Sequence, residues 1–84
     1  ETARETLALA AAAGHGDALR FRRTDVAEEE DVRALVELAT ATYGRIDCMF
    51  NNAGVAGAFG PITHTTVAEW DYTFAVLVRS VFLG

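Results

Sequence analysis

Apolar and polar residues recur along the chain with helical spacing in three stretches. Residues 1–13 are rich in Ala, Leu and Glu and are followed by Gly14-His15-Gly16, which predicts a helix and then a plain turn. Residues 28–44 begin with an acidic run and continue with apolar residues at helical spacing, which predicts an amphipathic helix of about four turns that ends at a glycine. Residues 66–81 open with Thr66-x-x-Glu69, the spacing of a capping box, and predict a long third helix.

Two shorter stretches have the pattern of strands. In residues 18–24, Leu19 and Phe21 alternate with arginines, as in a strand with one solvated face. Residues 46–51 are mostly apolar and too short for a helix, which is typical of a buried parallel strand. The order helix, strand, helix, strand, helix predicts the α/β class with right-handed crossovers.

Charge and composition exclude several classes of partner. The formal net charge of −5 argues against nucleic acid, and the arginines of residues 20–23 are interpreted as a solvated sheet edge. The apolar run of residues 7–13 is too short to span a membrane. The single cysteine, Cys48, cannot form an internal disulfide. We expect it to be a small buried residue in a protein of the reducing cytoplasm.

The candidate chemistry follows the two predicted strands, because ligands of open α/β sheets lie beyond the carboxyl ends of the strands. Asp25 can accept a hydrogen bond from an exocyclic amine, and Val26 offers an apolar surface to a flat ring. A role as a loop or helix-capping aspartate is an equally good interpretation of Asp25. In Asn51-Asn52-Ala53-Gly54, the small residues allow a bulky cofactor to approach the backbone and the amides can bond to backbone or sugar.

These elements together resemble the central stretch of the short-chain dehydrogenase/reductase family. The resemblance is carried by Asp25-Val26, by residues 43–47, by Asn51-Asn52-Ala53-Gly54 with the three residues after it, and by the helix from Glu69-Trp70 to Gly84. It implies a partial Rossmann-type doubly wound parallel sheet, here with two strands and three helices. It also implies that residues 1–84 are an internal part of one NAD(P)-binding domain, with no domain boundary inside the chain.

The resemblance assigns roles to individual residues. Asp25 and Val26 would hold the adenine ring, whereas Asn52, Ala53 and Gly54 would line the nicotinamide-ribose side of NAD or NADP. The parent would be a homo-oligomeric oxidoreductase that transfers hydride between the cofactor and a small alcohol or carbonyl substrate. In this family the catalytic Ser and the Tyr-x-x-x-Lys pair come later in the sequence. The chain would therefore hold no catalytic residue and would be inactive alone.

One position departs from the family pattern. The family often carries a catalytic asparagine seven residues after the helix tryptophan, and that count from Trp70 arrives at Leu77. Leucine cannot bond to water, so a proton relay would need another group, and a cofactor sensor without catalysis remains an alternative. A receiver-like module with Asp25 as phosphoacceptor is less favoured, because Asn51-Asn52 offers no acidic partner for Mg²⁺. His15 and His64 have no carboxylate at metal-ligand spacing, so we expect no metal site.

Overall fold

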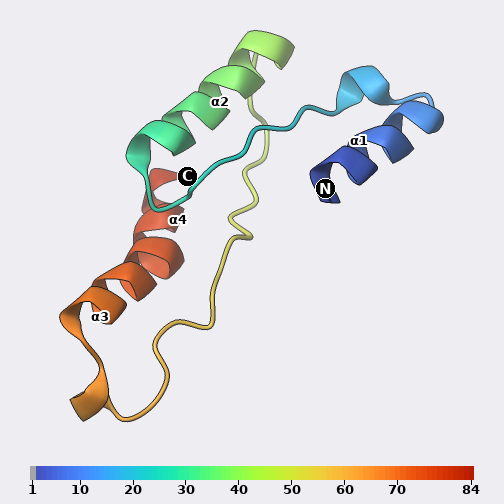
Figure 1. Ribbon diagram of the computed structural model, residues 1–84. Helices are drawn as coiled ribbons and strands as arrows, with labels where there is room; N and C mark the ends of the chain where they lie inside the picture. Colours follow the sequence, from blue (N-terminus) through green and yellow to red (C-terminus); the bar gives the residue numbers. More distant parts are fainter. Residues whose placement is uncertain (1) are drawn as a thin grey trace.

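The computed structural model describes residues 2–84, which form helices joined by extended segments and loops (Figure 1). The helices, in chain order, are α1 (Thr2–Ala12), the 3₁₀-helix η1 (Gly16–Ala18), α2 (Glu29–Tyr43), the 3₁₀-helix η2 (Ile62–His64), α3 (Val67–Phe74), the π-helical turn η3 (Ala75–Arg79) and α4 (Ser80–Leu83). The last three follow one another without a break and form a single long helix.

The three predicted helices are confirmed, with Glu1 of the first one outside the described residues. At the end of α2, Gly44 adopts a left-handed φ of 86° and its N–H donates to Thr40 O, as expected of a glycine that closes a helix. At the start of α3, the hydroxyl of Thr66 accepts a hydrogen bond from the N–H of Glu69 at 3.1 Å. Local signals in the sequence therefore decided where these helices begin and end.

The prediction of a partial doubly wound parallel sheet with two strands in this chain is wrong. Among residues 2–84 the segments 18–24 and 46–51 are not strands, and no backbone hydrogen bond joins one to the other. The physical reason is that a strand exists only through hydrogen bonds to a neighbouring strand. Apolar alternation indicates which backbone can be extended, but it supplies no partner, and these two segments do not pair with each other.

The described chain is elongated, and little of its surface is buried. Its radius of gyration is 16.2 Å, whereas a compact domain of 84 residues has one of about 12 Å. Its accessible surface of 6702 Å² exceeds by about 1,800 Å² the surface of about 4,900 Å² expected for a compact monomer of 9.0 kDa. The buried apolar side chains are Ala27, Val32, Ala75 and Val76. Ala27, Ala75 and Val76 form a small core cluster, against which Val26 packs.

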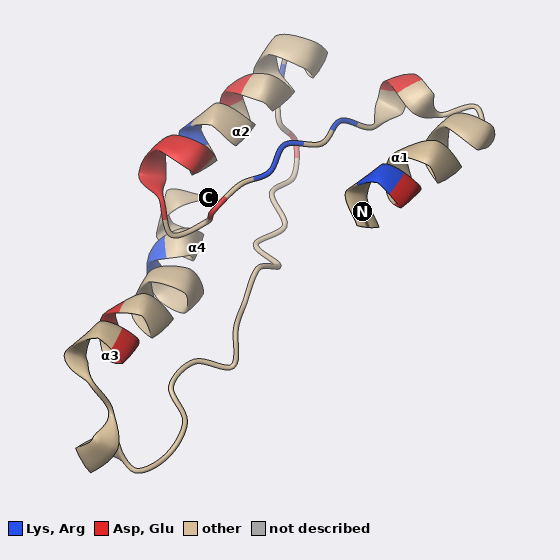
Figure 2. Ribbon diagram, viewed as in Figure 1, with Lys and Arg blue, Asp and Glu red and all other residues tan. Residues whose placement is uncertain are grey.

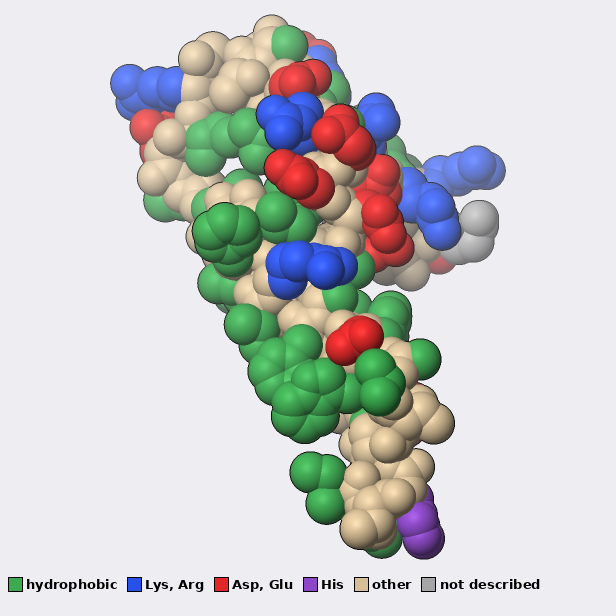
Figure 3. Space-filling model, turned by 90° about the vertical axis from the view of Figure 1, so that its left-hand side faces the viewer, with side chains coloured by type: hydrophobic (Ala, Val, Ile, Leu, Met, Phe, Trp, Pro, Cys, Tyr) green, Lys and Arg blue, Asp and Glu red, His purple; other side chains and the backbone are tan. Residues whose placement is uncertain are grey.

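Many large apolar side chains consequently lie in contact with solvent, and Figure 3 shows apolar atoms gathered over much of one side of the molecule. Phe50 is 84% exposed and Phe82 is exposed to the same degree. Trp70 and Phe74 stack on each other with ring centroids 4.6 Å apart, yet both remain about half exposed. Cys48 is exposed as well, so the expectation that it is buried is wrong; like its neighbours in residues 46–51, it is not buried by any part of the described chain.

Charged residues separate into two groups around the start of α2 (Figure 2). Acidic side chains occupy its first turn, where the positive end of the helix dipole favours them. Arg33 forms exposed ion pairs with Glu29 at 3.3 Å and with Glu30 at 3.5 Å. The arginines of residues 20–23 lie on the extended segment that leads into this helix and are exposed, but the sheet edge predicted for them is wrong, because residues 2–84 form no sheet.

Candidate functional site

The turn that precedes α2 is held by Asp25. Its Oδ1 accepts a hydrogen bond from the N–H of Ala27 at 3.0 Å, and its backbone oxygen accepts one from the N–H of Glu28 at 3.0 Å. The backbone N–H of Asp25 donates to Asp31 Oδ2 at 2.9 Å. This geometry is that of an Asx-turn in the loop before α2, so the loop interpretation of Asp25 describes one of its two carboxylate oxygens. The helix-capping interpretation is wrong, because the N-cap of α2 is Glu28 and no side chain caps it.

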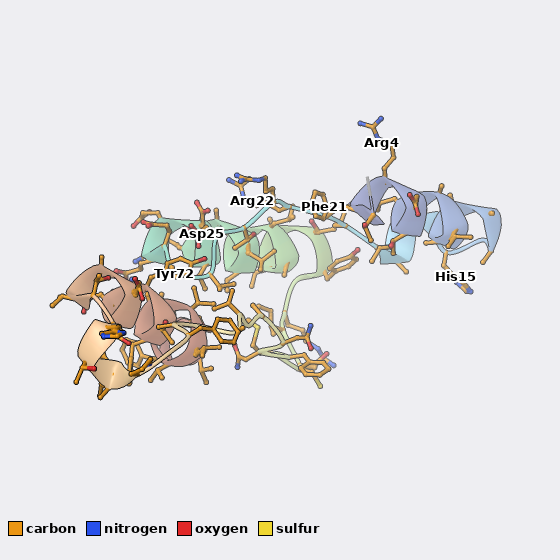
Figure 4. All side chains as sticks on the ribbon, turned by 60° about the horizontal axis from the view of Figure 1, so that its bottom comes forward. Arg4, His15, Phe21, Arg22, Asp25 and Tyr72 are labelled. Carbon is orange, nitrogen blue, oxygen red and sulfur yellow. The ribbon has the colours of Figure 1, made fainter. Side chains whose placement is uncertain are left out.

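The other carboxylate oxygen of Asp25 has a different environment. Oδ2 accepts no hydrogen bond from residues 2–84, and the side chain is exposed at the start of α2 (Figure 4). A carboxylate oxygen of this kind can accept a hydrogen bond from an amine of a ligand. Val26, the next residue, is half-buried and packs on the core. The loop and ligand-binding interpretations of Asp25 are therefore compatible, since each uses a different oxygen.

The segment that contains Asn51-Asn52-Ala53-Gly54 runs along the long C-terminal helix in the opposite direction. A Cβ on Gly54 would lie 3.5 Å from Leu77 Cδ2, and a Cβ on Gly57 would lie 2.9 Å from Thr73 Cγ2. At the other end of the segment, Asn51 Oδ1 lies where a Cβ on Gly84 would be. Close approach of this segment to the helix thus depends on glycine at Gly57 and Gly84, whereas a Cβ on Gly54 would make an ordinary contact with Leu77.

The two predicted site segments meet at a cavity of about 90 Å³. It is lined by Thr24, Val26, Val32, Leu35, Met49, Phe50, Asn51, Asn52, Ala53, Ser80 and Gly84. The structure therefore brings Val26 together with Asn52 and Ala53, which lie more than twenty residues away in the sequence. Asp25 and Gly54 border this region without lining the cavity.

Sequence reasoning missed two residues that build this region. Arg79 donates from Nη2 to Ala27 O at 2.9 Å, a partly buried bond across 52 residues of sequence that fixes the turn of Asp25 to the long helix. Ser80 is 7% exposed and lines the cavity. A serine at a core-facing position of an apolar helix was a visible signal for Ser80. No local pattern could identify the partner of Arg79, because that contact depends on the tertiary structure.

The remaining candidate residues lie partly at this site and partly far from it. Leu77 lies against Gly54, so the position expected to carry the relay asparagine does adjoin the Asn-Asn-Ala-Gly segment. His15 follows α1 at one end of the molecule, far from Asp25 (Figure 4), and residues 2–84 contain no group of three or more His, Cys, Asp or Glu side chains that could hold a metal ion. In the described part of the chain, no helix is long and apolar enough to cross a membrane.

Comparison with known proteins identifies the family. The family model described as Enoyl-(Acyl carrier protein) reductase matches residues 1–84. Levodione reductase of Leifsonia aquatica is 45% identical over 60 residues, which are 71% of this chain and 22% of that protein. The 2-(R)-hydroxypropyl-CoM dehydrogenase of Xanthobacter autotrophicus is 44% identical over 64 residues, 74% of this chain and 26% of that protein. The sepiapterin reductase of Chlorobaculum tepidum is 40% identical over 58 residues, 69% of this chain and 23% of that protein.

The chain belongs to the short-chain dehydrogenase/reductase family, as its motifs predicted. It spans about a quarter of the length of the curated relatives it matches. Those relatives are named as reductases and dehydrogenases, so oxidoreduction is the general activity of this family.

Proposed function

We propose that this chain is the central part of the NAD(P)-binding domain of an oxidoreductase that transfers hydride between NAD or NADP and a small alcohol or carbonyl compound. The observation that carries the proposal is the meeting of Val26 with Asn52 and Ala53 at one cavity, in a chain that belongs to a family of dehydrogenases and reductases. The matched residues make up only about a quarter of each relative, which supports a parent protein longer than these 84 residues.

The residues present offer groups that fit the adenine and the nicotinamide-ribose side of a dinucleotide. Val26 supplies an apolar wall, Asn52 supplies amide donors and acceptors, and the small Ala53 leaves the backbone accessible. Asp25 Oδ2, which no described residue uses, would accept a hydrogen bond from the adenine amine. The cavity of about 90 Å³ is smaller than the roughly 300 Å³ at which ligand pockets begin, so other parts of the parent must complete the site.

When bound, NAD(P) supplies the hydride that is exchanged with the substrate. The residues of this chain bind and orient it: Asp25 and Val26 at the adenine, and Asn52, Ala53 and Gly54 at the nicotinamide-ribose side. Leu77 presents a hydrocarbon surface beside Gly54 and cannot hydrogen-bond to water. A proton relay in this protein therefore uses a group other than residue 77, and the catalytic Ser and Tyr-x-x-x-Lys pair belong to other parts of the parent.

A second candidate is a cofactor-binding regulator without catalysis, and the leucine beside Gly54 favours it. Two further properties belong to the proposal. The broad apolar surface of the long helix, with Trp70, Phe74, Val78 and Val81 between 45% and 55% exposed, supports a homo-oligomer. The single cysteine and the net charge of −5 support a cytoplasmic protein that acts on small molecules and does not bind nucleic acid.

Titration calorimetry of the full-length protein with NAD(H) and NADP(H) tests the proposal, with Asp25→Asn and Asp25→Ala as variants. Asp25→Asn keeps an oxygen for the N–H of Ala27 but can replace the ligand-facing oxygen by a donor, whereas Asp25→Ala removes both. We expect both variants to bind about 1–3 kcal/mol more weakly. Asp25→Asn should fold as stably as the wild type.

Unchanged binding in both variants would remove Asp25 from the site, and a full-length protein that binds neither cofactor would refute the proposed function. Binding of NAD(H) without turnover of any alcohol or carbonyl in a broad panel would favour the regulator over the enzyme.

A further inference from the structure

Ser80 is the polar side chain that is buried among residues 2–84. It follows the π-helical turn η3 and is the first residue of α4. A hydroxyl in such a place needs a hydrogen-bond partner, and that of Ser80 donates to Val76 O at 2.5 Å. The bond joins the residue that follows the π-turn to Val76 inside it.

The backbone of the turn explains why this bond is needed. In a regular α-helix, the N–H of residue 80 would donate to the carbonyl oxygen of residue 76, four positions earlier. Here the N–H of Ser80 donates to Ala75 O, five positions earlier. The Ser80 hydroxyl thus supplies Val76 O with the donor that the backbone supplies in a regular helix. The bond stabilises the π-turn selectively, because in a regular α-helix it would be redundant.

The π-turn decides which side chains face the segment of residues 51–57. A π-turn contains one residue more than an α-turn, so the helix after the turn is rotated by about 100° relative to the helix before it. Thr73, before the turn, adjoins Gly57, whereas Ser80, after it, lines the cavity with Asn51. Leu77, inside the turn, adjoins Gly54. Without the extra residue of the π-turn, a helix with Thr73 near Gly57 could not also place Ser80 near Asn51, because Ser80 would be rotated by about 100°.

We propose that Ser80 is a positioning residue for the cofactor end of the site. Its hydroxyl holds the π-turn, the π-turn places Leu77 on Gly54, and that contact fixes the backbone of the Asn-Asn-Ala-Gly segment. Ser80 acts through Leu77 and does not touch the cofactor. The inference rests on the proposed function for its effect on NAD(H), but its structural part stands independently.

The test compares Ser80→Ala, Ser80→Thr and Thr40→Ala in the full-length protein. Thr40 is a matched control, because its hydroxyl also donates to the carbonyl four residues earlier, Val36 O, at 3.1 Å, but on the exposed face of a regular helix. We expect Ser80→Ala to raise the Kd for NAD(H) about tenfold, the equivalent of about 1.4 kcal/mol. Ser80→Thr keeps the hydroxyl and its extra methyl group has room in the adjoining cavity, so it should bind like the wild type, as should Thr40→Ala.

A lower melting temperature of Ser80→Ala with the Kd of the wild type would show a merely structural role and overturn the proposal. A second readout needs no cofactor: the nuclear Overhauser effect between the Leu77 methyl groups and the Gly54 Cα protons. It should be present in the wild type and Ser80→Thr and lost in Ser80→Ala. Persistence of this signal in Ser80→Ala would refute the positioning role, whether or not the protein binds NAD(H). Absence of NAD(H) binding in the wild type would by itself refute only the proposed function.

Should Ser80→Ala fail to fold, Ser80→Cys takes its place, since the thiol has a similar volume and is a much weaker donor. Ser80→Cys should also raise the Kd and weaken the Leu77–Gly54 signal. Wild-type values for both measurements in Ser80→Cys would overturn the proposal.

Discussion

Replacing Arg79 by alanine should destabilise the full-length protein, because the Arg79–Ala27 bond joins the turn before α2 to the long C-terminal helix. The guanidinium donates to Ala27 O at 2.9 Å, and Ala27 is only 9% exposed, so water replaces the lost donor poorly. A hydrogen bond from a charged donor contributes about 1.5–3 kcal/mol, and the exposed position of Arg79 places the expected loss near 2 kcal/mol.

Urea unfolding measures this loss. With m-values of about 1–3 kcal/mol per molar, a loss of about 2 kcal/mol lowers the midpoint by roughly 0.7–2 M. Arg33→Ala is the matched control: it removes exposed ion pairs with Glu29 and Glu30 and should cost less than about 1 kcal/mol. Equal midpoint shifts for Arg79→Ala and Arg33→Ala would refute the structural role assigned to the Arg79–Ala27 bond.

The remaining predictions concern the glycine contacts, residue 77 and the chain by itself. Gly57→Ala should destabilise the full-length protein by more than the roughly 1–2 kcal/mol that a left-handed backbone costs a residue other than glycine, because the new Cβ would also meet Thr73. Gly60→Ala is the control, since Gly60 has a left-handed φ but open space around it, and equal unfolding midpoints for the two variants would contradict the prediction. If the parent is active, Leu77→Asn should change the pH–rate profile more than the Kd for NAD(H), and it should lower stability through lost apolar burial. An unchanged pH–rate profile would exclude residue 77 from the proton relay. Residues 1–84 expressed alone should neither bind NAD(H) measurably nor turn over substrate, and should be aggregated or only partly helical, since about 1,800 Å² more surface is exposed than in a compact monomer. A well-dispersed NMR spectrum with a cooperative thermal transition would contradict that expectation.

The helices of this protein were predictable because their signals are local. Thr66 and Glu69 are three residues apart, and Gly44 directly follows the last helical residue of α2, so each boundary is decided within one turn of chain. The same holds for the family, which was identified from short motifs such as Asn51-Asn52-Ala53-Gly54. The π-turn at Ala75–Arg79 had no such signal, since four apolar residues and an arginine are equally compatible with a regular helix.

The tertiary structure decided the features that depend on contacts between residues far apart in the sequence. Residues 18–24 and 46–51 have the composition of strands, but a strand needs a hydrogen-bonded neighbour, and residues 2–84 supply none. The same dependence explains why Val26 and Asn52 could be singled out from the sequence while their meeting at one cavity could not. Sequence by itself determined the helices and the family, because both reside in contiguous residues. Pairing, burial and the bond of Arg79 to Ala27 arise between distant residues, and only the folded chain decides them.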